Sequence, residues 1–332
     1  MKRITRRLWT TEEYHYPGAY GYIPRLDGYL HEDDESRPCI IVAPGGAYLR
    51  CSPSEGEPVA LKFYEMGYQA FVCSYTVNFV GVEPIGKQAL NDLARAVRMV
   101  RKSAAEYHVD SERIAACGFS AGGHCVGSLG VHWQDVEENN PEYAGISCRP
   151  DAMILSYPLI SVYSEIEWSG YGSAENLLGT KATEEEKNCM RLENHVTELC
   201  PSAFIWQTVT DEILSVRNSM VFAESCRRAG VKFALHLFSD GNHGLSVADE
   251  TARTTLENYY TLESAKCVLE ACERGDVNLT QEKRKKLLES QEASIIKDVN
   301  SVVKPSKYHP EAKQWVGLAE NWLEQQWGKQ AF

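Results

Sequence analysis

Short apolar runs alternate with longer amphipathic stretches along most of this chain. Six apolar runs are expected to form strands: residues 39–43, 69–73, 113–117, 152–155, 204–206 and 233–237. Within most of these runs the apolar residues are nearly continuous, instead of alternating with polar ones. Continuity of this kind is typical of strands that are buried on both faces of a parallel sheet.

Helical periodicity appears between the apolar runs. Between the second and third runs, Leu90, Leu93 and Val97 recur at steps of three and four residues. The charged residues Asp92 and Arg95 fall elsewhere on the helical wheel. This pattern predicts an amphipathic helix. A second helix is expected to begin after Ser215, as its N-cap, and to end before Gly230.

Strands that alternate with helices predict βαβ units with right-handed crossovers. The expected fold class is therefore α/β, with a mostly parallel, doubly wound sheet flanked by helices. Two segments interrupt the alternation. Residues 158–200 are expected to form a loop-rich cap, and residues 249–309 a polar helical insertion before a last amphipathic helix that contains Trp315 and Trp322. We treat the 332 residues as a single domain with these two additions.

Composition excludes several classes of partner. A net charge of −12 argues against nucleic-acid binding, which needs clustered Lys and Arg. No apolar run reaches the roughly 18 residues of a membrane span, and the basic start lacks the apolar core of a secretion signal. The 11 cysteines contain no Cys-x-x-Cys pair, which favours reduced thiols over disulfides or a zinc site. We therefore expect a cytoplasmic protein without a membrane partner.

The strongest chemical signal is the segment Gly118-Phe119-Ser120-Ala121-Gly122. It follows one predicted strand and opens a predicted helix, which is the context of the G-x-S-x-G nucleophile elbow. Glycines at both ends let the backbone turn tightly, so the serine hydroxyl projects above the sheet. The sequence therefore predicts that Ser120 is the nucleophile of a serine hydrolase, and that the amide of Ala121 contributes to the oxyanion hole.

A second loop, Pro44-Gly45-Gly46-Ala47-Tyr48, directly follows the first predicted strand. Lipases and esterases of this fold place an HGGG-type loop there, whose backbone amides form half of the oxyanion hole. We expect the amides of Gly45, Gly46 and Ala47 to take this role, although Pro44 stands where the histidine would be. We also assign Tyr48 to substrate binding.

Chain order indicates the acid and the base, because the triad of this fold runs Ser, then Asp or Glu, then His. Asp211 follows the fifth predicted strand and His243 follows the sixth. We therefore predict that Asp211 is the acid and His243 the base. Glu212 and Asp240 are the rival acids. His124, His132 and His236 are expected to be structural.

These segments resemble the acetyl esterase and acetylxylan esterase-like branch of the α/β-hydrolases, which includes BD-FAE and hormone-sensitive-lipase-like enzymes. The similarity covers about residues 35–248 and the last helix. The motifs that carry it are Pro44-Gly45-Gly46-Ala47-Tyr48, Glu57-Pro58-Val59-Ala60, Gly67-Tyr68, Gly118-Phe119-Ser120-Ala121-Gly122-Gly123-His124, Glu175-Asn176-Leu177-Leu178-Gly179, His195-Val196-Thr197 and His243-Gly244-Leu245-Ser246.

The resemblance implies a serine esterase that deacetylates small acetyl esters or acetylated sugars and needs neither a metal nor another cofactor. The 249–309 insertion departs from the family pattern and leaves substrate size and a possible homo-oligomer open. Three alternatives remain. An arylformamidase would use the same elbow on a formyl amide, and a serine peptidase would use the same triad. A non-catalytic binding protein would normally have lost part of that triad.

Overall fold

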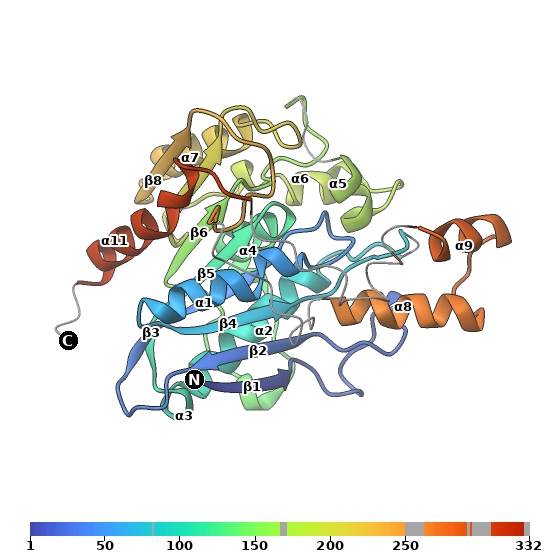
Figure 1. The fold of residues 1–332 in the computed structure, drawn as a ribbon, viewed down its shortest axis with the longest axis horizontal. Coiled ribbons are helices and arrows are strands. Elements are labelled where there is room, and N and C mark those ends of the chain that lie inside the picture. The colour runs from blue at the N-terminus through green and yellow to red at the C-terminus, as the bar shows by residue number, and fades with distance from the viewer. Residues whose placement is uncertain (82, 167–170, 250–261, 291–292, 294–306, 329–332) are drawn as a thin grey trace.

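A computed structural model describes residues 1–81, 83–166, 171–249, 262–290, 293 and 307–328. Eight strands form one sheet through the middle of the molecule, in the order β1-β2-β4-β3-β5-β6-β7-β8 (Figure 1). From β4 to β8 all neighbours are parallel, whereas β1 and β2 are antiparallel additions at one edge. The strands are β1 (Lys2–Arg7), β2 (Arg25–Leu30), β3 (Arg37–Ala43), β4 (Gln69–Ser74), β5 (Val109–Phe119), β6 (Ala152–Ser156), β7 (Ser202–Thr208) and β8 (Phe233–Phe238).

The six predicted strands are confirmed as β3 to β8, and the predicted α/β fold class is confirmed with them. The two N-terminal strands, β1 and β2, were not predicted. In β1 five of the six residues are exposed, and the strand has the sequence KRITRR, so no apolar run marks it. In β2 a buried aspartate, Asp27, and a glycine, Gly28, interrupt the apolar residues.

Helices cover both faces of the sheet and divide the core in two. On one face lie α2 (Gln88–Lys102), α4 (Ala121–His132) and α7 (Arg217–Ala229), and on the other α1 (Glu57–Glu65) and α11 (Trp315–Trp327). The residues of β3 alternate between the two cores: Ile41 packs on the first, and Ile40 and Val42 on the second. Both faces of the central strands are therefore buried, which explains their continuous apolar runs.

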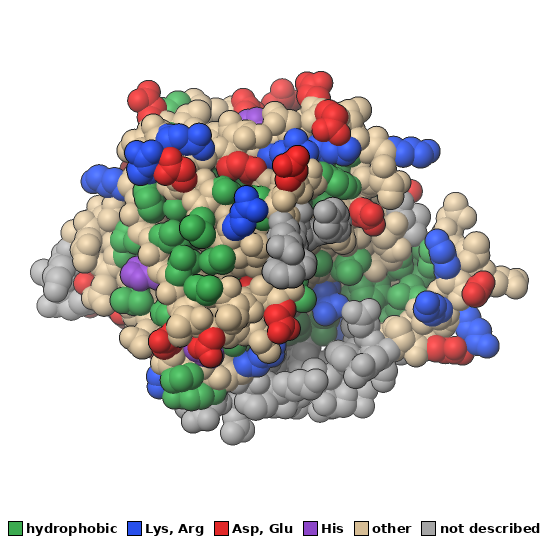
Figure 2. Space-filling view, turned by 90° about the horizontal axis from the view of Figure 1, so that it is seen from above, with side chains coloured by type: hydrophobic (Ala, Val, Ile, Leu, Met, Phe, Trp, Pro, Cys, Tyr) green, Lys and Arg blue, Asp and Glu red, His purple; other side chains and the backbone are tan. Residues whose placement is uncertain are grey.

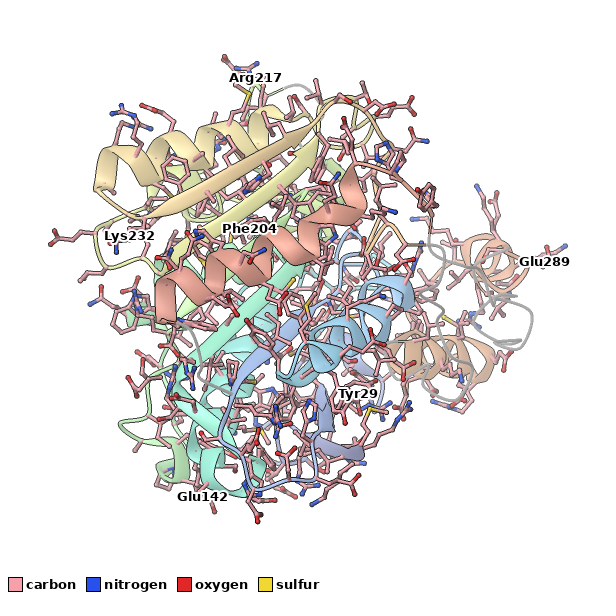
Figure 3. The ribbon with its side chains drawn as sticks, turned by 60° about the vertical axis from the view of Figure 1, so that its left-hand side comes forward. Tyr29, Glu142, Phe204, Arg217, Lys232 and Glu289 are labelled. Carbon is pink, nitrogen blue, oxygen red and sulfur yellow. The ribbon has the colours of Figure 1, made fainter. Side chains whose placement is uncertain are left out.

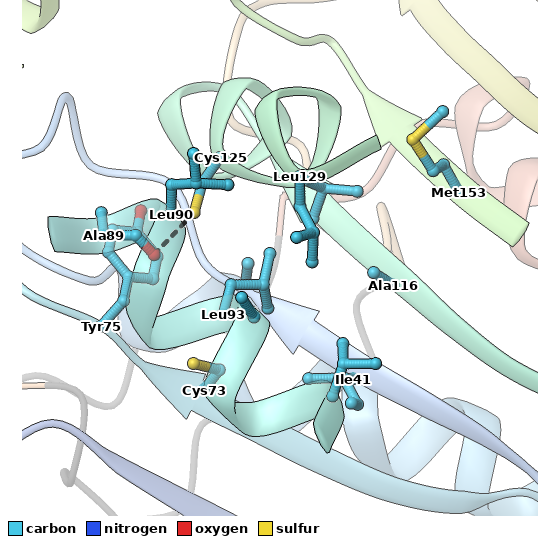
Figure 4. Close-up of a cluster of buried hydrophobic side chains, with 14 of the residues drawn as sticks. Ile41, Cys73, Tyr75, Ala89, Leu90, Leu93, Ala116, Cys125, Leu129 and Met153 are labelled. Carbon is cyan, nitrogen blue, oxygen red and sulfur yellow. Dashed lines mark hydrogen bonds between the residues drawn. The ribbon is translucent and has the colours of Figure 1, made fainter. Parts of the chain in front are cut away.

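Figure 4 shows the first core, where Leu93 of α2 and Leu129 of α4 pack over Ile41 and Ala116 of the sheet. The thiol of Cys125 donates to the carbonyl of Ala89 in this cluster. On the opposite face, α11 crosses the sheet beside Phe204 (Figure 3), whose ring lies 5.9 Å from that of Trp322. The final amphipathic helix thus belongs to the core of the fold.

The three helices predicted between the strands are present, as α2, α4 and α7. Gly230 ends α7 with a φ of 73°, which fits the expected C-terminal glycine. The predicted N-cap is wrong by one residue. Val216 occupies the cap position of α7, and the hydroxyl of Ser215 accepts from the amide of Arg217 at 3.4 Å.

Both interrupting segments contain helices where the structure describes them, and residues 158–200 are loop-rich, as expected. Residues 158–200 contain α5 (Tyr171–Leu178) and α6 (Glu184–Cys189), with residues 167–170 outside the described part. The predicted insertion contains α8 (Glu263–Arg274) and α9 (Gln281–Leu288), while residues 250–261, 291–292 and 294–306 lie outside it. The role of residues 158–200 as a cap, and the single-domain organisation, stay predictions.

The pair α8–α9 forms a lobe beside the ends of the central strands, with Glu289 at its outer side (Figures 1 and 3). Val268 and Leu269 of α8 pack with Phe79 in a third apolar cluster, and Glu263 forms an ion pair with Arg25 of β2. Figure 2 shows a hollow with hydrophobic side chains between this lobe and the body of the molecule. Among the described residues, no helix is long and apolar enough to cross a membrane.

Candidate active site

Ser120 lies on a sharp turn between β5 and α4, at the carboxyl end of a central strand. Its backbone has φ 52° and ψ −117°, a conformation that non-glycine residues rarely adopt and that is common at functional sites. The turn requires glycine on both sides. A Cβ on Gly118 would lie 2.2 Å from the carbonyl oxygen of Gly122, and one on Gly122 would lie 2.1 Å from that of Ala43. The Gly-x-Ser-x-Gly spacing therefore has a steric cause.

Three side chains from three loops meet at this turn. The Nε2 atom of His243 lies 2.9 Å from the hydroxyl oxygen of Ser120, and its Nδ1 atom lies 2.7 Å from Oδ2 of Asp211. Asp211 follows β7 and His243 follows β8, so the sheet brings together residues 123 positions apart. An ionised carboxylate only accepts, so Nδ1 of His243 donates to Asp211, and Nε2 accepts the serine proton.

Asp211 is fixed more firmly than its rivals. Its side chain is fully buried, and its Oδ1 atom accepts from the amides of Ile213 and Leu214 at 2.9 and 3.0 Å. Glu212 is exposed. Asp240 is exposed as well, and its Oδ1 atom accepts from Nε2 of His309. Of the three carboxylates, the geometry therefore places Asp211 on the imidazole.

The Pro44–Tyr48 loop lies directly against the nucleophile, since a Cβ on Gly45 would be 3.0 Å from Cβ of Ser120. Side chains hold two carbonyl groups of this loop. The carbonyl of Pro44 accepts from the hydroxyl of Tyr75 at 2.5 Å, and that of Ala47 accepts from the side-chain amide of Asn176 at 2.9 Å. The amides of Gly46, Ala47 and Ala121 donate to no acceptor within the described parts of the chain. These three donors are available to an oxyanion.

Two of the predicted assignments need correction. The amide of Gly45 donates to Oε2 of Glu55 at 2.9 Å, so it is not free to bind an oxyanion. The side chain of Tyr48 is buried, with 1% exposed, and its hydroxyl donates to Nδ1 of His124 at 2.8 Å. Tyr48 therefore packs inside the protein instead of facing a substrate.

His124 is a structural histidine, as expected. Its Nε2 atom donates to the carbonyl of Met190 at 2.9 Å, while burial lowers its pKa to about 4. A neutral ring can accept from Tyr48 and donate to Met190 at the same time. Tyr48 and His124 thus form one buried contact, and His124 lies on α4, the helix that follows the elbow.

Two residues of the site were not predicted from the sequence. Glu55 and Tyr157 are buried, and a hydrogen bond of 2.6 Å joins the tyrosine hydroxyl to Oε1 of the carboxylate. The ring of Tyr157 lies 4.9 Å from that of His243, centroid to centroid. Tyr157 follows the end of β6, and this position at the carboxyl edge of the sheet was the one available signal. Within the described residues, no three His, Cys, Asp or Glu side chains are arranged to hold a metal ion.

Comparison with known proteins places the chain in a family. The model of the BD-FAE family matches residues 26–226. A solved structure, the acetyl ester-xyloside bifunctional hydrolase of Caldicellulosiruptor lactoaceticus, is 32% identical with a TM-score of 0.68, and the match covers 83% of this chain and 97% of that one.

Two curated proteins are also similar. Endo-1,4-beta-xylanase B of Butyrivibrio fibrisolvens is 45% identical over 250 residues, which are 75% of this chain and 39% of that protein. The acetylxylan esterase of Xylanibacter ruminicola is 27% identical over 223 residues, which are 65% of this chain and 42% of the other. This chain thus spans about two fifths of the length of each curated relative.

The family match covers the elbow, the Pro44–Tyr48 loop and Asp211, and the structural match extends over most of the chain. Together with the eight-stranded, mostly parallel sheet, these similarities identify the chain as a member of the BD-FAE family of the α/β-hydrolases.

Proposed function

We propose that this protein is a serine carboxylic-ester hydrolase that removes acetyl groups from small esters or acetylated sugars. The observation that carries the proposal is the continuous hydrogen-bonded chain from Ser120 through His243 to Asp211. At the Ser120 end of this hydrogen-bonded series, the nearby backbone amides of Gly46, Ala47 and Ala121 have no acceptor among the described residues. A nucleophile, a base, an orienting acid and an oxyanion site are the components that acyl transfer needs.

In the proposed reaction, the hydroxyl oxygen of Ser120 attacks the ester carbonyl while Nε2 of His243 takes its proton. Asp211 keeps the imidazole in the required tautomer and stabilises the cation. The amide of Ala121, with that of Gly46 or Ala47, stabilises the oxyanion. His243 returns the proton to the alcohol as the ester bond breaks, and water then hydrolyses the acyl-serine with His243 again as base.

The names of the relatives support an acetylated saccharide as the substrate, because two of the three refer to acetyl esters or acetylxylan. The xylanase relative does not change the proposal. Glycosidases use two carboxyl groups that flank the scissile bond. Here the two buried carboxylates of the site, Asp211 and Glu55, are hydrogen-bonded to protein donors. The 11 cysteines are all free, which supports a reducing compartment such as the cytoplasm.

A substrate panel tests this function. We expect kcat/KM for an acetate ester to exceed that for the matching octanoate ester by about tenfold or more, because each extra methylene must fit a pocket shaped for a short acyl group. Acetylated xylo-oligosaccharides should be deacetylated, whereas N-formylkynurenine should react more slowly. The measurement is initial rates on one purified sample, with Ser120→Ala as the background control.

Each competing function predicts a different ranking in this panel. Faster cleavage of octanoate than of acetate would contradict the acetyl-esterase assignment. A preference for N-formylkynurenine would instead indicate an arylformamidase. No turnover of any substrate by folded protein would favour a binding protein.

A further inference from the structure

A buried carboxylate connects the oxyanion loop to the histidine loop. Glu55 is 4% exposed, and each of its oxygens has one donor: Oε2 accepts from the amide of Gly45 at 2.9 Å, and Oε1 accepts from the hydroxyl of Tyr157 at 2.6 Å. Gly45 adjoins Gly46 and Ala47, whose amides have no acceptor among the described residues, so Glu55 holds the backbone that carries these donors.

Tyr157 extends the connection to the base. Its hydroxyl accepts from the amide of Ser246 at 2.9 Å, three residues after His243, and its ring packs edge-on against the imidazole. The hydroxyl of Ser246 donates to the carbonyl of Ser54 at 2.5 Å, which closes a ring of contacts next to Glu55. From the last helix, the indole N–H of Trp315 donates to the carbonyl of Ser246 at 2.8 Å.

The backbone of this network is itself strained. Tyr157 has a φ of 35° and Ser246 a φ of 54°, both in the left-handed region. Such residues persist only where the surrounding contacts hold them, and they cluster at functional sites. The hydrogen bonds to Glu55, Ser54 and Trp315 supply that support.

The donors around Glu55 indicate its charge state. With an N–H on one oxygen and an O–H on the other, the side chain acts only as an acceptor, as an ionised carboxylate does. Burial raises the pKa of Glu55 above its ordinary value, while the hydrogen bond from Tyr157 and the positive charge that His243 can carry act in the opposite direction. Burying a charge costs free energy unless the charge is well hydrogen-bonded, so holding the two loops through a buried carboxylate lowers the stability of the fold.

We propose that Glu55 is a positioning residue that sets the oxyanion loop in register with His243, by bonding Gly45 and Tyr157 at the same time. The inference rests on the proposed esterase function and deepens it. Attack of Ser120 needs the base and the oxyanion donors in place together, and a shift of about 1 Å in such a site can cost about 10²-fold in rate. The link should therefore affect the chemical step more than substrate binding.

Two single variants and their combination test the link. Glu55→Gln leaves one of the two donors without an acceptor, and Tyr157→Phe keeps the ring against His243 but removes both hydrogen bonds of the hydroxyl. We expect each to lower kcat on an acetate ester by about 10- to 100-fold, with KM changed less than about threefold. The kcat of the double variant should lie within about threefold of that of the slower single variant, because both changes break the same connection.

Asp151→Asn is the matched control. Asp151 is a partly buried carboxylate that accepts from the amide of Ile114 and from Arg101. It directly precedes β6, at the opposite end of the strands from Ser120. Its replacement should lower the melting temperature and leave kcat within about twofold of wild type. Melting curves of all variants separate a loss of alignment from a loss of stability, and Tyr157→Phe carries the test alone if Glu55→Gln does not fold.

Three results would overturn the positioning role while leaving the esterase proposal intact. The first is kcat within about twofold of wild type in both single variants, and the second is independent multiplication of their effects in the double variant. The third is an equal fall in kcat in Asp151→Asn at an equal loss of melting temperature, which would make the effect one of stability. An inactive wild-type protein on every ester of the panel would contradict the esterase function itself.

Discussion

Replacing Ser120 with alanine is expected to abolish nearly all turnover of an acetate ester, with a fall in kcat of about 10⁵- to 10⁶-fold. In the proposed reaction, the hydroxyl oxygen bonded to Nε2 of His243 forms the covalent intermediate, and an alanine has no atom that could replace it. Losses of this size follow removal of the nucleophile in other hydrolases that use a Ser-His-Asp triad. Rates should be measured with enough enzyme to detect the residual hydrolysis.

The Ser120→Ala variant should remain folded. The hydroxyl of Ser120 is bonded to His243, while the local turn is held by backbone contacts, such as the amide of Ser120 to the carbonyl of Ser156 at 3.0 Å. Melting temperature and circular dichroism should therefore stay close to those of wild type. A folded variant that keeps more than about a tenth of the wild-type kcat would mean that another residue attacks the ester.

Asp211→Asn should be the second most damaging change, with a fall in kcat of about 10⁴-fold. The asparagine has nearly the same shape and can still accept from the amides of Ile213 and Leu214 through its oxygen. Its amide nitrogen would then face Nδ1 of His243 and favour the wrong tautomer. The base would be held in place but unable to accept the serine proton, so kcat should fall far more than stability.

Glu212→Gln and Asp240→Asn are the controls for this prediction. Both side chains are exposed, and neither contacts the imidazole, so each change should cost less than about tenfold in kcat. Measuring kcat for the three folded variants distinguishes the carboxylates. If Glu212→Gln or Asp240→Asn is the crippled variant while Asp211→Asn stays active, the assignment of the acid is wrong.

The sequence was sufficient to predict the elements whose identity depends on local pattern. The central strands are buried on both faces, so their apolar runs are unmistakable, and the elbow has its two glycines because a Cβ at either position would meet backbone. Chain order, with the position of each residue after a predicted strand, led to Asp211 and His243. The strands β1 and β2 were missed because their residues are charged or interrupted by glycine. Their conformation depends on pairing, β2 with β4 and β1 with β2.

The errors at the site have a common physical cause. A backbone amide or a tyrosine hydroxyl looks available in a sequence, whereas its partner is decided by tertiary structure. The amide of Gly45 is taken by Glu55, ten residues later, and the hydroxyl of Tyr48 by His124 on α4. Glu55 and Tyr157 themselves were missed because a carboxylate in a Ser- and Gly-rich loop and an aromatic residue after a strand give no distinctive pattern.

Labelling with a fluorophosphonate tests the central claim most directly, because the reagent reacts with a serine that is activated by a neighbouring base. We expect the intact mass of the wild-type protein to increase by one reagent adduct, and peptide mapping to place that adduct on Ser120. The Ser120→Ala variant should not be labelled, and Asp211→Asn should be labelled much more slowly. An adduct on a different residue, or no adduct on folded wild-type protein, would contradict the assignment of Ser120 as the activated nucleophile.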